Sequence, residues 1–164
     1  MKKLNFGCGR AIKEGWVNVD FQNGEGIDRS FDFLDYPYPF TDDTFDYVLI
    51  DNVLEHLDDP TRVMREIWRI CKNGAIVEII VPYYNSYYAY ADPTHKNYFS
   101  DLSMRQTLGE VEYAHDSQRE RFDIEMDLVP QRFLRGLPFG VLNVLRRFLN
   151  NVIVEIRAKA RVVK

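Results

Sequence analysis

The chain has few cysteines and no long hydrophobic run, and both absences narrow the class of protein. Its 164 residues include only Cys8 and Cys71, too few for the disulfide framework of a small secreted domain. No apolar stretch approaches the ~18 residues that a membrane-spanning helix requires. The opening Met1-Lys2-Lys3 leads directly into a strand pattern and not into a signal peptide. We therefore expect a cytoplasmic protein without a transmembrane segment.

The composition indicates one globular domain with an uneven distribution of charge. A hydrophobic fraction of 46% favours a packed core over disorder, and the length fits a single domain over residues 1–164. The net charge is −4, yet residues 131–164 contain eight basic side chains and a single acid, Glu155. This basic region is either a solvated face of the last elements or a surface for an anionic partner. Candidate partners are phosphate, acidic sugars, lipid head groups and nucleic acid.

Short apolar runs separated by turns predict an α/β fold around a parallel sheet. Residues 45–51 are almost continuously apolar, as expected for a central strand covered on both faces. An amphipathic helix is predicted from Pro60, after two acids that can cap it, and Gly74 is expected to end it as a left-handed cap. Further strands are predicted at residues 4–6, 16–20, 30–34 and 75–81.

The last third of the chain has a different pattern. Residues 121–128 and 152–163 alternate apolar and polar side chains, which is typical of strands with one wet face. We expect these strands to form an antiparallel pair at the edge of the sheet, with residues 139–149 as a short amphipathic helix. An exposed last strand could pair with a second copy of itself, which makes a homodimer a candidate assembly. Residues 110–120 are expected to be a charged connection.

Two glycines and an acid near the N-terminus indicate a nucleoside-cofactor site. The first strand ends at Gly7, Gly9 follows after one residue, and Asp20 closes the second strand. Glycines let the backbone approach a ligand closely, and a carboxylate at the next strand tip can accept hydrogen bonds from ribose hydroxyls. A parallel crossover normally takes a dozen or more residues, and fewer are present here. The first helix is therefore expected to be short or degraded.

Five segments between residues 4 and 100 form a recognisable set. They are Asn5-Phe6-Gly7-Cys8-Gly9, Gly15-Trp16-Val17-Asn18-Val19-Asp20, Phe45-Asp46-Tyr47-Val48, Val53-Leu54-Glu55-His56-Leu57 and Asp92-Pro93-Thr94-His95. Together these segments resemble a compact, type 11-like group of small-molecule methyltransferases that depend on S-adenosylmethionine. The resemblance implies a three-layer, Rossmann-like α/β sheet, mostly parallel, with an antiparallel C-terminal strand pair and a reduced first helix. It covers residues 4–100 well and the remainder only by topology.

The resemblance also implies where S-adenosylmethionine would bind. The glycine turn would face the methionine part, Asp20 would take the ribose hydroxyls, and Asp32 with Phe33 would hold the adenine. Larger members of the family often have an acid where this chain has Asn5, which weakens any expected contact with the cofactor's amino group. The implied cofactor-binding residues are Asn5, Gly7, Cys8, Gly9, Asp20, Asp32, Phe33, Asp51, Asn52 and Val53.

A base and an acceptor pocket are expected in the aromatic stretch over residues 83–99. His95 is the candidate base, because its ordinary pKa near 6.5 suits proton removal from an acceptor; alternatively it fixes the loop through a hydrogen bond. The tyrosines Tyr83, Tyr84 and Tyr88 are expected to line the acceptor pocket, or else to serve as plain packing.

No required metal is expected. Some quinone-pathway O-methyltransferases bind a divalent metal through Glu-x-x-Glu-His, and this chain has Asn52 in place of the first glutamate, with Glu55 and His56 following. With one ligand missing, His56 is expected to act near the substrate or as a cap.

The sequence therefore predicts a methyltransferase acting on a small-molecule, glycan or lipid-linked acceptor, with oxygen as the favoured atom. A lipid-linked or anionic substrate would dock on the basic region and the 139–149 helix. The alternative is a non-catalytic cofactor-binding or scaffold protein of the same fold. A nicotinamide-dependent oxidoreductase is less favoured, because the third glycine of the dinucleotide fingerprint is absent.

Overall fold

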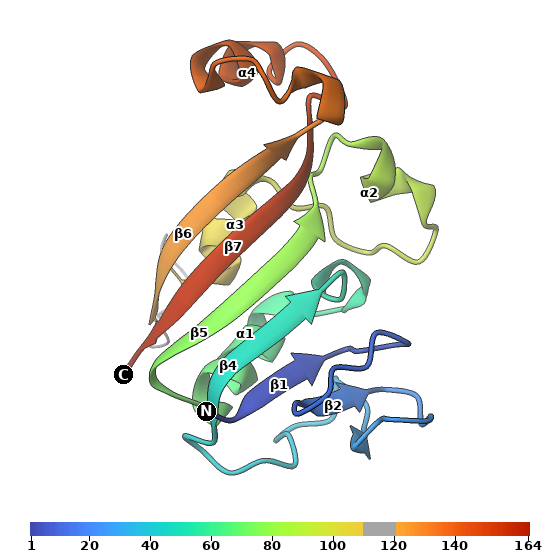
Figure 1. The fold of residues 1–164 in the computed structure, drawn as a ribbon, viewed down its shortest axis with the longest axis vertical. Coiled ribbons are helices and arrows are strands. Elements are labelled where there is room, and N and C mark those ends of the chain that lie inside the picture. Colours follow the sequence, from blue (N-terminus) through green and yellow to red (C-terminus); the bar gives the residue numbers. More distant parts are fainter. Residues whose placement is uncertain (110–120) are drawn as a thin grey trace.

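The computed structural model describes residues 1–109 and 121–164, in which seven strands form one sheet of order β3-β2-β1-β4-β5-β7-β6 (Figure 1). The strands are β1 (Lys3–Phe6), β2 (Val17–Asp20), β3 (Arg29–Ser30), β4 (Phe45–Asp51), β5 (Cys71–Pro82), β6 (Arg121–Pro130) and β7 (Ile153–Val163). The helical elements are α1 (Pro60–Ile70), α2 (Tyr87–Ala91), α3 (Asp101–Thr107) and α4 (Phe139–Leu145), with 3-10 turns η1 (Leu54–His56) and η2 (Arg132–Leu134). The predicted mostly parallel sheet with an antiparallel C-terminal pair is confirmed. The connection expected over residues 110–120 lies outside the described residues.

Parallel pairing brings the ends of the first strands to one edge of the sheet. Leu4 on β1 is paired with Val17 on β2 and with Val48 on β4, and Leu4 and Val48 are fully buried. Strands β3 and β5 extend the same parallel arrangement on either side. The segments that follow β1, β2 and β4 therefore meet beyond the carboxyl ends of the strands, where ligands bind in open α/β sheets.

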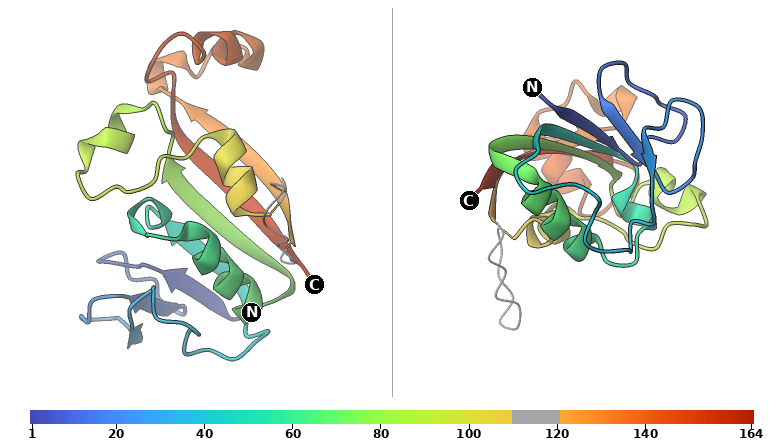
Figure 2. Two further views of the ribbon diagram at one scale, coloured as in Figure 1. Left: turned by 180° about the vertical axis from the view of Figure 1, so that it is seen from behind. Right: turned by 90° about the horizontal axis from the view of Figure 1, so that it is seen from below.

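Two helices cover one face of the sheet. Helices α1 and α3 are on the same side of the sheet (Figure 2). Residues 7–16 connect β1 to β2 through turns alone, so the expected reduction of the first helix extends to its complete loss. In the described residues, turns take the place of this helix on the face opposite α1 and α3, and that face is open there. Part of that open face is covered by Trp16, whose ring meets the Tyr47 ring edge-on at 5.5 Å.

Helix α1 forms where its capping signals predict. Asp59 accepts a hydrogen bond of 2.9 Å from the Arg62 amide, and Pro60 is the first helical residue. The apolar stripe of the helix is buried against the sheet. Gly74 differs from its expected role as a cap, because the helix ends at Ile70 and β5 begins immediately. Its positive φ of +78° instead falls where β5 shifts its register against β4, an irregularity that glycine accommodates readily.

Strand β7 lies between β5 and β6, and this position explains much of its basic character. Its side chains Arg157, Lys159 and Arg161 are register partners of acids on β6, namely Asp127, Glu125 and Asp123. Opposite charges facing each other across an antiparallel pair stabilise it by about 0.2–1 kcal/mol each. The interpretation as a solvated face therefore fits this strand. The expectation of an exposed last strand is wrong, because β6 occupies the edge and β7 is interior.

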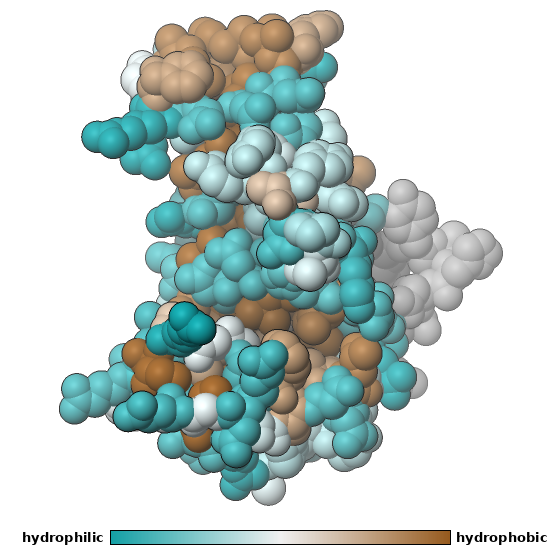
Figure 3. Space-filling view, turned by 90° about the vertical axis from the view of Figure 1, so that its right-hand side faces the viewer, coloured by the Kyte–Doolittle hydropathy of each residue, from teal (hydrophilic) through white to brown (hydrophobic). Residues whose placement is uncertain are grey.

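Residues 131–152, which we call the apical cap, project beyond the sheet and contain η2 and α4 (Figure 1). Phe133 is 82% exposed and Phe148 is 80% exposed, and Phe139, Val144 and Leu149 are exposed as well. Hydrophobic residues gather at this end of the molecule (Figure 3). Among the described helices, none has the length and apolar character needed to cross a bilayer.

Candidate functional site

A pocket of about 700 Å³ lies where the segments after β1, β2, β3 and β4 meet. Six of the residues predicted to bind the cofactor line it, together with His56, which was predicted on the substrate side. The full lining is Gly7, Asp20, Phe21, Asp32, Phe33, Leu34, Asn52, Val53, His56, Leu57, Asp58, Thr94 and Lys96. A volume of this size is typical of small-molecule and cofactor sites.

Asp20 joins the glycine turn to the end of β2. Its Oδ2 accepts a hydrogen bond of 2.8 Å from the Gly9 amide, and its Oδ1 accepts one of 3.1 Å from the Gln22 amide. The residue is only 7% exposed, yet it lines the pocket. A carboxylate oxygen has two lone pairs, so both oxygens keep accepting capacity toward a ligand. The two amides hold the carboxylate in place before any ligand arrives.

Gly7 is required by both its backbone angle and its neighbour. Its φ is +70°, and a Cβ built on it would overlap the side chain of Val53. Since the Gly7 and Cys8 amides both donate to the Val19 carbonyl at 2.9 Å, the turn cannot relax away from this contact easily. A residue without a side chain thus lets the backbone approach Val53 and line the pocket.

Asn52 has a left-handed backbone, with φ of +53°, directly after β4. Its amide donates to the Ile80 carbonyl at 2.9 Å, and its side-chain Nδ2 donates to Asp51 Oδ1 at 2.8 Å. Non-glycine residues in this region are uncommon, and they concentrate at ligand sites. The strained conformation directs the chain from the central strand into the wall of the pocket.

Asp32 and Phe33 follow the very short β3 and form another side of the pocket. The ring of Phe33 is buried and stacks on Phe6 with centroids 4.1 Å apart. Asp32 is exposed, and its Oδ1 accepts a hydrogen bond of 2.9 Å from the Leu34 amide. An apolar ring beside an accessible carboxylate matches the roles that the resemblance implies for adenine.

Four predicted cofactor residues are not part of the pocket lining: Asn5, Cys8, Gly9 and Asp51. Asn5 is buried, and its Nδ2 donates to the Ala11 carbonyl at 2.8 Å and to Asn18 Oδ1 at 2.9 Å. It therefore holds the turns that replace the first helix. Gly9 acts through the hydrogen bond that it donates to Asp20.

Two histidines and a glutamate lie together at the η1 end of the pocket. Ligand atoms of Glu55, His56 and His95 are all within 4.8 Å of one another, and the two imidazole rings meet edge to face with centroids 4.7 Å apart. His56 lines the pocket, whereas His95, the predicted base, is not among the lining residues. Burial lowers the pKa of His56, and the neighbouring His95 lowers it further.

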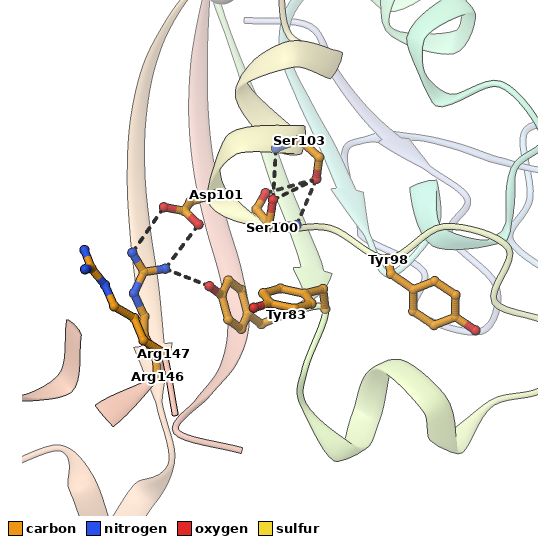
Figure 4. Close-up of a pocket in the computed structure, with 8 residues that line it drawn as sticks. Tyr83, Tyr98, Ser100, Asp101, Ser103, Arg146 and Arg147 are labelled. Carbon is orange, nitrogen blue, oxygen red and sulfur yellow. Dashed lines mark hydrogen bonds and ion pairs between the residues drawn. The ribbon is translucent and has the colours of Figure 1, made fainter. Parts of the chain in front are cut away.

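The predicted tyrosines Tyr83 and Tyr84 line a different pocket, of about 490 Å³, between α3 and the apical cap. Arg146 donates to the Tyr83 hydroxyl at 2.7 Å and forms an ion pair of 3.1 Å with Asp101 (Figure 4). Arg147 lines the same pocket. Tyr88, in contrast, is exposed on α2 and lines neither of these two pockets. The basic region of the sequence indicated these arginines, but nothing in the pattern predicted that Arg146 pairs with Asp101.

Comparisons with known proteins agree with this geometry. A family model described as a methyltransferase domain matches residues 28–79, about a third of the chain. A methyltransferase of Archaeoglobus fulgidus that depends on S-adenosylmethionine is 19% identical, with a TM-score of 0.70 over 98% of this chain and 85% of that one. A Mesorhizobium loti methyltransferase with the same dependence is 13% identical, with a TM-score of 0.63 over 98% and 90%. The [4+2]-cyclase SpnF is 14% identical, with a TM-score of 0.64 over 98% and 74%. A comparison with curated sequences gives no match.

The chain thus has the Rossmann-like fold of methyltransferases that depend on S-adenosylmethionine, and the recognition made from its motifs is confirmed. The domain match and the structural neighbours support S-adenosylmethionine as the cofactor. The family model begins after β2, so it does not include the Gly7–Gly9 turn or Asp20.

Proposed function

We propose that the protein transfers a methyl group from S-adenosylmethionine to a small-molecule or glycan-type acceptor, at oxygen. The observation that carries this proposal is the pocket in which Asp20, Gly7 and Val53 meet at the carboxyl ends of β1, β2 and β4. The carboxylate of Asp20 would accept hydrogen bonds from the ribose hydroxyls, while Phe33 and Asp32 would hold the adenine. The sulfonium would lie near Asn52 and Val53, on the side toward His56.

Methyl transfer at an activated sulfonium requires alignment of the acceptor and, for a hydroxyl, removal of its proton. His95 is proposed to serve this proton removal together with His56, which lines the pocket and whose ring contacts that of His95. In each ring Nδ1 is engaged in a hydrogen-bond contact, and Nε2 has none within the described residues. The second pocket, with Tyr83, Tyr84 and Arg147, is proposed to receive the more distant part of the acceptor.

We extend the proposal to an acceptor held at an anionic lipid surface. The apical cap exposes Phe133, Phe139 and Phe148, and residues 128–154 contain no acidic side chain. Four arginines lie in the same segment, of which Arg146 is paired with Asp101. Aromatic side chains flanked by arginines are the chemistry by which proteins lie on membrane interfaces. If the protein does not bind lipid, the exposed residues of the apical cap would instead contact a protein partner or a second copy of the chain.

The alternative is a non-catalytic cofactor-binding or scaffold protein of the same fold; one structural neighbour is a [4+2]-cyclase, so the fold alone does not require methyl transfer. Two free cysteines, both buried, support the cytoplasm as the proposed compartment.

The test of the main proposal is a thermal shift with S-adenosylhomocysteine against the same concentration of NAD, since a ligand of the native state raises its stability. A rise in Tm with the former alone is expected. No shift with S-adenosylhomocysteine would contradict the proposal.

A further inference from the structure

Glu55 is a buried acid beside His56, and within the described residues its carboxylate oxygens have no hydrogen-bond partner. The residue is 1% exposed. A buried carboxylate without partners is costly, and native structures almost always satisfy one. A cation bound to the carboxylate would remove this cost.

Backbone hydrogen bonds hold Glu55 in position. Its carbonyl accepts hydrogen bonds from the Lys96 amide at 2.7 Å and the Asn97 amide at 3.0 Å. These bonds tie η1 to the loop that carries His95. Two segments that are about 40 residues apart in sequence are thereby held with their donor atoms within 4.8 Å.

Each histidine has its Nδ1 engaged in a way that leaves Nε2 available. His95 Nδ1 lies 2.8 Å from the Ala89 carbonyl oxygen, which can only accept, so this nitrogen carries the proton. Thr94 Oγ1 donates its proton to Asp92 Oδ1 at 2.7 Å, and it lies 2.9 Å from His56 Nδ1. The hydroxyl therefore accepts from His56 Nδ1–H. In both neutral rings the lone pair is on Nε2.

This arrangement has the features of a metal site and of the groups that support one. Ligating histidines usually donate their other ring nitrogen to a carbonyl, a carboxylate or a bridging polar group, which fixes the tautomer and the orientation of the ring. Here the Ala89 carbonyl supports His95, and the Thr94–Asp92 pair supports His56. Two imidazoles and one carboxylate suit Zn²⁺ and similar transition ions better than Mg²⁺, which prefers oxygen ligands.

We propose that Glu55, His56 and His95 bind one divalent transition-metal ion, with Zn²⁺ as the probe, and that the ion keeps an open coordination position. This replaces the expectation that no metal is required. That expectation counted ligands within residues 52–56, and His95 comes from a different segment. Because His56 lines the pocket, the open position would face it. This step rests on the proposed function: an ion there would lower the pKa of an acceptor hydroxyl, and the two histidines would serve its proton removal by holding the ion.

The binding test does not involve methyl transfer, so this proposal and the proposed function can fail separately. Protein stripped with a chelator is titrated with Zn²⁺ by calorimetry, and with Co²⁺ while its visible absorption is recorded. One ion per chain and a Co²⁺ absorption band are expected, with no heat from Mg²⁺ at the same concentration. Glu55→Gln keeps the shape of the side chain and should weaken Zn²⁺ binding at least tenfold. Thr94→Val removes the support of His56 and should weaken it by about ten- to a hundredfold.

Glu78→Gln is the matched control, because Glu78 is a half-buried carboxylate on β5 that accepts from the Tyr47 hydroxyl away from this cluster. It should bind Zn²⁺ as the wild type does. Circular dichroism verifies that each variant is folded. Absence of Zn²⁺ binding by folded wild-type protein would overturn the proposal. Unchanged affinity in both Glu55→Gln and His95→Ala would overturn it as well, since the ion would then be held elsewhere.

Discussion

The Gly9 amide donates a hydrogen bond of 2.8 Å to Oδ2 of Asp20, which joins the turn after β1 to the tip of β2. This single contact orients the carboxylate that the sequence singled out for the ribose. It also explains how the pocket keeps its shape although the connection between these strands has lost its helix. Since the Gln22 amide donates to the other oxygen, the carboxylate has little freedom to turn away from the pocket.

Asp20→Asn should weaken the binding of S-adenosylhomocysteine by about ten- to a hundredfold. A hydrogen bond to a charged group is worth about 1.5–3 kcal/mol, and about 1.4 kcal/mol corresponds to a factor of ten. Calorimetric titration measures the change. Asp127→Asn is the control, because Asp127 lies across from Arg157 on β6 and should bind the ligand as the wild type does. Equal affinities in wild type and Asp20→Asn would remove Asp20 from the site.

Gly7→Ala should destabilise the protein more than Gly9→Ala. Both glycines have positive φ, which costs an alanine about 1–2 kcal/mol. Only at Gly7 would the new Cβ overlap Val53, whereas nothing lies within 4 Å of the Gly9 position, and overpacking adds about 1–3 kcal/mol. Urea unfolding of both variants gives the comparison.

Adding Val53→Ala to Gly7→Ala separates the two contributions. The double variant should be more stable than the sum of the two single substitutions predicts, because the two Val53 methyl groups that overlap the new Cβ are gone. The strain of the backbone would remain. Strict additivity of the two substitutions would show that Gly7 and Val53 do not contact each other as described.

His95→Ala should keep the binding of S-adenosylhomocysteine within about twofold and reduce methyl transfer by about a hundredfold or more. The ring does not line the pocket, so the cofactor loses no contact. The assay uses labelled S-adenosylmethionine with an acceptor that is first identified from cell extract. Undiminished transfer by a folded variant would show that His95 has no part in the methyl transfer.

The ion pair between Asp101 and Arg146 should make stability depend on pH in the acid range. Burial alone would raise the pKa of Asp101, but the hydrogen bond and charge of Arg146 outweigh it and lower the pKa. Because the pKa is lower in the folded state, the stabilisation is present above the ordinary pKa near 3.9. It is lost as the pH falls through the lower, folded-state value.

Asp101→Asn should therefore be less stable than the wild type at pH 7, and the difference should shrink below about pH 4. Urea midpoints of both proteins across this range provide the measurement. A difference that is constant with pH would indicate that the Asp101 charge contributes nothing to the pair.

Replacing Arg132, Arg135 and Arg147 by glutamine should weaken binding to vesicles of anionic lipid by about a hundredfold, since each basic residue near such a surface contributes about 1 kcal/mol. Replacing Arg157, Lys159 and Arg161 removes the same charge and is the matched control, because acids on β6 face these residues. Co-sedimentation with anionic and neutral vesicles, at two salt concentrations, distinguishes the variants. Equal loss in both triple variants would mean that net charge alone drives binding. Absence of binding by the wild type would contradict the lipid-surface proposal.

The sequence predicted the sheet well where a single local pattern determined the element. The apolar run of β4, the cap of α1 by Asp59 and the alternation of β6 and β7 each correspond to the observed element. Gly74 was placed wrongly, because a helix cap and a strand irregularity both use a glycine with positive φ. The position of β7 inside the sheet could not be predicted from alternation, which is the same for an edge strand and for an interior strand.

The candidate site was predicted where residues follow strand ends, and not where distant loops meet. Asp20 and Val53 line the pocket because the ends of parallel strands share one edge. The proximity of His95 to Glu55 depends on hydrogen bonds between η1 and a loop about 40 residues later, for which no sequence period exists. The pairing of Arg146 with Asp101 depends on how the apical cap folds back toward α3, and it could likewise not be predicted from the sequence.

A crystal structure of the protein with S-adenosylhomocysteine tests the central claim most directly. The adenosine is expected in the pocket beside Phe33 and Val53, with both ribose hydroxyls within hydrogen-bond distance of the Asp20 carboxylate. Ligand bound at another place, or in this pocket without contact to Asp20, would contradict the account.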